Sequence, residues 1–188
     1  MNIICDTSII INFLKINRLD LLAEYSHKFW VTDHVDREIT NDYPAQQQLF
    51  QSAFEKLAIQ KTSVEDPQEL DFFIELIKNG QLGSGECATI AVAVNRGYFL
   101  AIDDNQAIKK AELLMAPTKI LRTQDILVRM IRENLLSLES ADQLLQNWAT
   151  YHRFKLKIPT IKDLFSENNL LQEASFQWGV FPLVLKFV

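Results

Sequence analysis

Short apolar runs alternate with amphipathic segments along the first 122 residues of the chain. Each run is followed by a stretch in which apolar residues recur every three to four positions, the spacing of a helix that packs on one face. Strands that alternate with helices of this length are typical of βαβ units. The pattern therefore predicts an α/β fold with a central parallel sheet. The predicted strands are 2–5, 27–32, 98–102 and 119–121.

Small polar residues mark where two of the predicted helices begin. Thr7 and Ser8 follow the first strand, and we expect them to cap a helix that runs through Lys15. Ser84 stands in the same position before a second helix, which ends at Gly97. The capping by Thr7 and Ser8 would leave the neighbouring Asp6 free for another role.

The pattern becomes wholly helical after Arg122. Helices are predicted over 123–133, 140–151 and 160–165, so we expect an α/β domain over 1–122 and a helical extension over 123–188 that packs on it. The final stretch, 176–188, is strongly apolar. A bilayer span needs roughly 20 apolar residues, so this stretch is too short to cross a membrane. We expect it to pack on the domain, with the covering of a partner as the alternative.

Composition agrees with a globular protein outside the secretory pathway. The 188 residues are 48% hydrophobic and 23% charged, which suits one domain with a substantial core. The first residues show no basic region and no cleavage-like run, so no signal peptide is expected. Cys5 and Cys87 lie far apart in the sequence and form no Cys-x-x-Cys pair. Reduced thiols and a cytoplasmic location are the resulting expectations.

Five carboxylates occupy the positions where a parallel sheet gathers side chains at one edge. Because carboxylates are costly to bury and repel one another, such a cluster requires a cation. Oxygen-only ligands suit a hard divalent ion, so the sequence predicts Mg²⁺ or Mn²⁺. Each acid also has a structural alternative as a helix cap, a partner of the helix dipole or a solvated side chain. The five are Asp6, Glu38, Glu86, Asp103 and Asp104.

The adjacent pair Asp103 and Asp104 follows the most apolar strand. One of the two is expected to bind metal while the other caps the helix that begins at Asn105. A shift of one residue in the turn would exchange these roles, so the residues themselves leave the choice open.

The distribution of charge is uneven. The formal net charge is −5, which at first argues against a nucleic-acid partner. Residues 1–118 hold 10 Lys and Arg against 17 Asp and Glu, whereas residues 119–188 hold 9 against 7. Because the predicted metal ligands contribute much of the negative charge, a polyanionic substrate remains compatible with this composition.

These acidic motifs together resemble those of PIN-domain ribonucleases. The resemblance is carried by Asp6 in ICDTSIIINFL, Glu38 in VxxE form, Glu86 in GxGExxxIxxA form and Asp103–Asp104 in LAIDDxxAxxxA form, over roughly residues 2–122. It implies a Rossmann-like α/β/α sandwich and Mg²⁺- or Mn²⁺-dependent cleavage of RNA. Many relatives are VapC-type toxins that a small antitoxin protein inhibits. The helical region 123–166 resembles an extension found in one subgroup of PIN proteins.

The resemblance also implies roles for individual residues. Asp6, Glu38, Glu86 and one of Asp103 and Asp104 match the catalytic, metal-binding acids. Ser8 matches a small hydroxyl residue that often lies near the metal. Many relatives carry Thr-x-Asp in the last motif, and Ile102 replaces that threonine here, which favours Asp104 by alignment and leaves Asp103 open.

RNA is the expected partner, with phosphate contacts from Lys109, Lys110 and Arg122 on the domain and from Arg129, Arg132, Arg153, Lys155 and Lys157 beyond it. A small antitoxin is a further expected partner, and homodimerisation is expected because the family often dimerises. Two other functions fit the residues. One is a catalytically silent PIN-fold binding or regulatory protein. The other is a Rossmann-like phosphatase acting on small phosphates, although such enzymes usually place Asp-x-Asp after the first strand.

Overall fold

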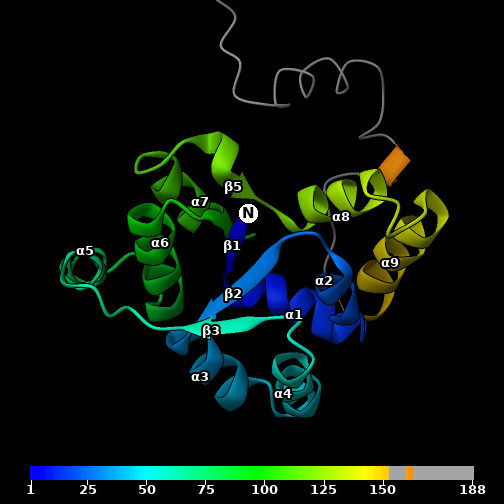
Figure 1. Ribbon diagram of the computed structural model, residues 1–188, viewed down its shortest axis with the longest axis horizontal. Helices are drawn as coiled ribbons and strands as arrows, with labels where there is room; N and C mark the ends of the chain where they lie inside the picture. The colour runs from blue at the N-terminus through cyan, green and yellow to red at the C-terminus, as the bar shows by residue number, and fades with distance from the viewer. Residues whose placement is uncertain (153–159, 163–188) are drawn as a thin grey trace, which may run out of the picture.

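A parallel sheet forms the centre of the protein (Figure 1). The computed structural model describes residues 1–152 and 160–162. Within them the sheet has five strands in the order β3-β2-β1-β4-β5, and every neighbouring pair is parallel. The predicted α/β fold with a central parallel sheet is confirmed. The strands are β1 (Asn2–Cys5), β2 (Lys28–Thr32), β3 (Gln60–Thr62), β4 (Phe99–Ala101) and β5 (Ile120–Leu121).

Strand β3 is the strand that the hydrophobic pattern did not predict. It consists of Gln60, Lys61 and Thr62, and none of these residues is fully buried. It lies at one edge of the sheet, where it pairs only with β2. Because an edge strand of three polar residues buries no apolar side chain, it leaves no apolar run in the sequence.

Helices cover both faces of the sheet, which gives the three layers of an α/β/α sandwich (Figure 1). Helices α5, α6 and α7 lie on one face, while α1, α4, α8 and α9 lie on the other. The helices of the described residues are α1 (Thr7–Lys15), α2 (Asp20–Glu24), α3 (Asp33–Asp42), α4 (Gln47–Glu55), α5 (Pro67–Lys78), α6 (Ser84–Arg96), α7 (Asn105–Glu112), α8 (Thr123–Arg132) and α9 (Leu138–Tyr151), with short 3-10 turns η1 (Pro44–Gln46) and η2 (Pro117–Lys119).

Alternate residues of β1 serve two separate cores. Ile3 and Cys5 are fully buried in the core beneath α1, α4, α8 and α9, while Ile4 is fully buried against α6 and α7. The side chains of a strand point to opposite faces in turn, so a strand covered on both faces is apolar throughout. Central β1 could therefore be predicted from four residues.

Helices α8 and α9, which follow residue 122, contribute to the first of these cores. Leu127 of α8 and Trp148 of α9 are fully buried in the same cluster as Phe13 of α1. The rings of Phe13 and Trp148 meet edge to face, with centroids 5.9 Å apart. The division of the chain at residue 122 stays a prediction, as does the packing of the apolar stretch 176–188, which lies outside the described residues. Of the predicted helix 160–165, residues 163–165 lie outside them too.

Among the helices of the described residues, none combines the length and the apolar character needed to cross a membrane.

Candidate active site

Asp6 occupies the junction between β1 and α1. Its backbone N–H donates to the carbonyl of Ala101 at 2.9 Å, so the ends of β1 and β4 lie side by side. The Asp6 side chain is itself the cap of α1, because its Oδ2 accepts the Ser8 N–H at 3.0 Å. The expectation that Thr7 and Ser8 cap this helix was therefore wrong. An aspartate at the N-cap reaches the amide two residues on, which requires no help from later hydroxyls.

The Asp6 carboxylate is only 4% exposed. Burial raises its pKa, the Ser8 hydrogen bonds lower it, and the negative charge of Glu38 raises it again. A buried carboxylate is normally paired with a cation. The charge that acts on Asp6 is instead that of another acid, Glu38. Asp6 is thus a buried capping residue whose charge is opposed by the charge of Glu38.

Glu38 reaches the same place from the second turn of α3. Its Oε2 accepts the Thr7 hydroxyl at 2.8 Å. The same oxygen lies against the backbone of Gly85 in α6, at only 2.5 Å from where a Cβ on that residue would stand. The carboxylate of Glu38 therefore fills a space between α1 and α6 that exists because residue 85 has no side chain.

Glu86 closes the N-terminus of α6. Its Oε2 accepts the Gly83 N–H at 2.9 Å, and Gly83 occupies the N-cap position. The prediction that Ser84 is the cap was wrong by one residue, since the glutamate satisfies the helix end that a serine hydroxyl normally would.

The charges around Glu86 identify its neighbours. Burial is the largest cause of its raised pKa, and the Gly83 hydrogen bond opposes that effect. The charges of Asp6, Asp104 and Glu38 raise the pKa of Glu86 further. The charges of three carboxylates from three other elements therefore act on Glu86 at the carboxyl edge of the sheet.

Asp104 and Asp103 have different surroundings although they are adjacent. Asp104 is exposed and caps α7, because its Oδ1 accepts the N–H groups of Gln106 and Ala107 at 2.8 and 2.9 Å. Its charge reaches Glu86. Asp103 is half-buried and lies among hydrogen-bond donors of Asn12 and Thr123. Burial raises the pKa of Asp103, while those hydrogen bonds and Arg122 lower it.

The predicted substrate-binding residues lie around this edge. The Ser8 hydroxyl accepts the Asp103 backbone N–H at 3.2 Å, so Ser8 joins the end of β4 to α1. Arg122 follows β5 and donates from Nη2 to Asn105 Oδ1 at 2.9 Å. Lys109 is exposed and Lys110 half-exposed on α7. Their contacts with RNA stay predictions, and those of Arg153, Lys155 and Lys157 concern residues outside the described part of the chain.

Three residues that support these acids were not assigned to the site by sequence reasoning. They are Thr7, Asn12 and Thr123, whose side chains donate to Glu38 or Asp103. Thr7 adjoins Asp6 in the sequence, but Asn12 and Thr123 lie 111 positions apart and meet only through the fold. The glycines around Glu86 did carry a signal, since small residues there indicate a close approach of backbone and side chain.

The donor set suits a hard divalent cation, because every member is a carboxylate. In the conformation shown, no group of three or more His, Cys, Asp or Glu side chains within residues 1–152 and 160–162 is arranged to hold a metal ion. The chemistry of the residues fits such a cation, because four acids share one edge and the charge that acts on the buried Asp6 is that of another acid, Glu38. The metal itself stays a prediction.

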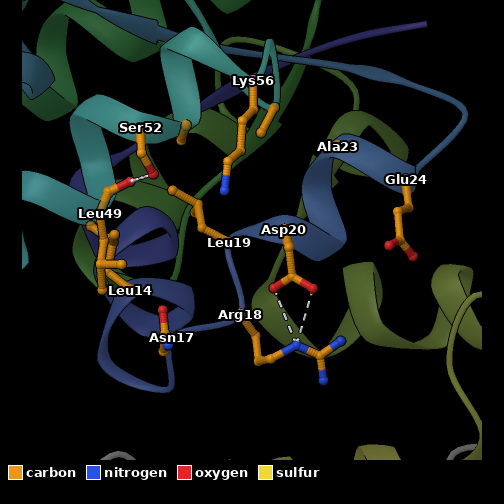
Figure 2. A pocket seen from close by; sticks show the side chains of 12 residues that line it. Leu14, Asn17, Arg18, Leu19, Asp20, Ala23, Glu24, Leu49, Ser52 and Lys56 are labelled. Carbon is orange, nitrogen blue, oxygen red and sulfur yellow. Dashed lines mark hydrogen bonds and ion pairs between the residues drawn. The ribbon is translucent and has the colours of Figure 1, made fainter.

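A cavity of about 380 Å³ lies at the other end of α1 and is lined by residues of α1, α2 and α4. Figure 2 shows Lys56 extending toward Leu19, with the ion pair between Arg18 and Asp20 nearby. The side chains of Leu14 and Leu49 give it an apolar wall. None of the predicted site residues lines this cavity, so the acidic edge and the cavity are separate features.

Comparison with known proteins agrees with the fold. A family model, DUF3368, described as a PIN domain, matches residues 2–166. A comparison with curated proteins returned no match, and neither did a comparison with solved structures. The matched region includes all five acids and continues through α8 and α9. PIN domains have a nuclease-type fold and typically use divalent metals. The chain belongs to the PIN-domain family.

Proposed function

We propose that this protein is a divalent-metal-dependent endoribonuclease that hydrolyses phosphodiester bonds in RNA. The observation that supports this function best is the convergence of Asp6, Glu38, Glu86 and Asp104 at the carboxyl edge of the sheet. There the charges of the other three raise the pKa of Glu86, and the charge of Glu38 raises the pKa of Asp6. An arrangement that is unfavourable for folding and is built from four separate elements indicates selection for a site.

Asp6, Glu86 and Asp104 are the residues that would hold Mg²⁺ or Mn²⁺. When bound, the cation supplies Lewis-acid polarisation of the phosphate and activation of water. Asp104 uses Oδ1 as a helix cap, which fixes the direction of its carboxylate. Glu38 is held by the Thr7 hydroxyl, so its carboxylate is oriented before any ligand arrives. No side chain is required as a covalent nucleophile.

Single-stranded or looped RNA is the proposed substrate, because its phosphates and bases are accessible to an open edge. Lys109, Lys110 and Arg122 are proposed to contact phosphates, since α7 and the end of β5 adjoin Asp104 in the fold. We also propose that the protein acts in the cytoplasm as a homodimer, and that a small antitoxin-type protein inhibits it. These proposals rest on the resemblance to VapC-type relatives.

The direct test is cleavage of a panel of RNAs with Mn²⁺ by the wild type and by Asp6→Asn. The asparagine retains a side-chain oxygen for the Ser8 N–H and removes the charge. Asp20→Asn is a matched control, since Asp20 is exposed on α2 and pairs only with Arg18 among the hydrogen bonds of the described residues. Cleavage by the wild type and the control, but not by Asp6→Asn, is expected. Equal cleavage by all three, or by none, contradicts the proposal.

The same preparations distinguish the two alternative functions. Hydrolysis of a generic phosphomonoester without cleavage of any RNA would indicate a phosphatase. The absence of Mn²⁺ binding in calorimetry would indicate a catalytically silent binding protein.

A further inference from the structure

The carboxylate of Asp103 is surrounded by donors from two helices. Its Oδ1 accepts the Thr123 backbone N–H at 3.1 Å, and its Oδ2 accepts the Thr123 hydroxyl at 2.6 Å. The amide of Asn12 also donates to Oδ2, at 2.9 Å. Both oxygens are thus engaged, and a hydrogen bond of 2.6 Å to a carboxylate is in the strong range. These hydrogen bonds give the Asp103 carboxylate a structural role, because they tie the turn after β4 to α1 and α8.

The donors themselves are buried and fixed by the segment that follows residue 122. Thr123 is fully buried at the start of α8, and Asn12 is 5% exposed in α1. The Asn12 amide also donates to the Thr123 hydroxyl at 3.1 Å. From α9, the indole N–H of Trp148 donates to the Asn12 carbonyl at 2.7 Å. A continuous network therefore runs from α9 through α1 to the residue beside Asp104.

The charges of Asp103 and Asp104 act on different neighbours. The acids whose charges raise the pKa of Glu86 are Asp6, Asp104 and Glu38. The charge of Asp103 instead acts on Asp125 in α8. The charge of Asp104 thus acts on an acid of the site, whereas Asp103 acts on Asp125 and accepts hydrogen bonds from Thr123, both in α8.

We propose that Asp103 is a positioning residue, and that Thr123 and Asn12 fix it so that the turn after β4 presents Asp104 to the site. This inference rests on the proposed nuclease function. The Asp103 backbone N–H donates to the Ser8 hydroxyl, so both the main chain and the side chain of this residue are held. Since Asp104 is the next residue, any rotation of the peptide after Asp103 moves the carboxylate of Asp104. Helices α8 and α9 are then part of the catalytic scaffold.

Thr123→Val is the central test, because valine has nearly the same shape and lacks the hydroxyl that donates to Asp103. Ile126→Val on the same helix is the matched control, since Ile126 is fully buried and its loss of one methyl group affects stability without touching Asp103. At a temperature well below unfolding, Thr123→Val is expected to lower kcat by about tenfold with KM unchanged, because small misplacements of catalytic groups are costly. Ile126→Val should keep the wild-type kcat.

Mn²⁺ titration separates positioning from ligation. Asp103→Asn is expected to retain the Mn²⁺ affinity within about threefold, whereas Asp104→Asn loses at least about tenfold, as removal of a direct ligand should. An equal loss in both variants would make Asp103 a ligand and overturn the inference. A wild-type kcat in Thr123→Val would reduce the network to a purely structural role and overturn it as well.

Hydrogen exchange of the metal-free protein provides a readout that does not depend on catalysis. The amides of residues 104–108 should exchange faster in Thr123→Val than in Ile126→Val, because the turn loses one of its anchors. Should the wild type cleave no RNA, the proposed function fails, while this comparison still decides the positioning role. Equal exchange in the two variants overturns it.

Discussion

Replacement of Gly85 by alanine should displace Glu38 without unfolding the protein. A Cβ at residue 85 would stand 2.5 Å from Glu38 Oε2 and 3.6 Å from Val35 Cγ2. An ordinary contact is at least 3.4 Å, so the carboxylate must retreat by about 0.9 Å, the difference between the two distances. Because the oxygen is the end of a flexible side chain, it moves more readily than the backbone of either helix.

The stability of Gly85→Ala should change little. Alanine in place of a helical glycine stabilises the folded protein by up to about 1 kcal/mol. The retreat of Glu38 breaks its hydrogen bond with the Thr7 hydroxyl, a loss of about 1 kcal/mol. These two contributions nearly cancel. Activity should respond far more, since a displacement of about 1 Å in a catalytic group can lower the rate by roughly 100-fold.

The assay is Mn²⁺-dependent RNA cleavage together with thermal unfolding of the same preparation. Gly83→Ala is the control, because a Cβ there would meet Glu86 Oε2 at an ordinary 3.7 Å. The control should remain active. Gly85→Ala with wild-type kcat and KM would refute the reasoning, since it would show that the position of Glu38 does not matter for the reaction.

Three further predictions concern stability. Asp6→Asn should raise the melting temperature of the metal-free protein by a few degrees at neutral pH. Because burial raises the folded-state pKa of Asp6, the destabilising effect of this carboxylate grows as pH rises through that pKa and vanishes in acid. Melting temperatures of the two proteins, measured in EDTA from pH 4 to 8, should therefore converge at the acidic end. Glu69→Ala should lower the free energy of unfolding in urea by about 3–5 kcal/mol, because the Glu69 side chain is 3% exposed and its removal leaves Arg96 without its carboxylate partner. A loss below about 1 kcal/mol would show that the pair contributes little. Trp148→Phe should cost about 1–3 kcal/mol, since the buried Asn12 carbonyl loses its indole donor, and unchanged unfolding would contradict that assignment.

The sequence was sufficient for the strands that are buried on both faces. Ile3 and Ile4 belong to different cores, so β1 is apolar from Ile3 to Cys5 and visible as a run. Strand β3 carries no such signal, because the Lys61 side chain is exposed and pairs with Asp36. Its existence depends on hydrogen bonding to β2 alone, which hydrophobic patterning does not detect.

For the site, the sequence placed the acids on the right elements and failed at their local geometry. Asp6 and Glu86 were both expected beside the start of a helix, with the capping assigned to Thr7, Ser8 and Ser84. Which residue caps each helix depends on one or two torsion angles, so the capping residues were wrong. The choice between Asp103 and Asp104 could not be made from the chain, because the donors that distinguish them include Asn12, distant in sequence. Contacts of this kind arise only when α1 and α8 are brought together.

The buried indole of Trp148 has a consequence for how this protein can be shortened. A chain ending at residue 122 would keep every acid of the edge and would still look complete as a sequence motif. It would nevertheless expose Phe13 to water and remove Thr123, the residue that donates twice to Asp103. A graft of the acidic motifs alone would therefore transfer the carboxylates without the helices that hold Asp103 in place.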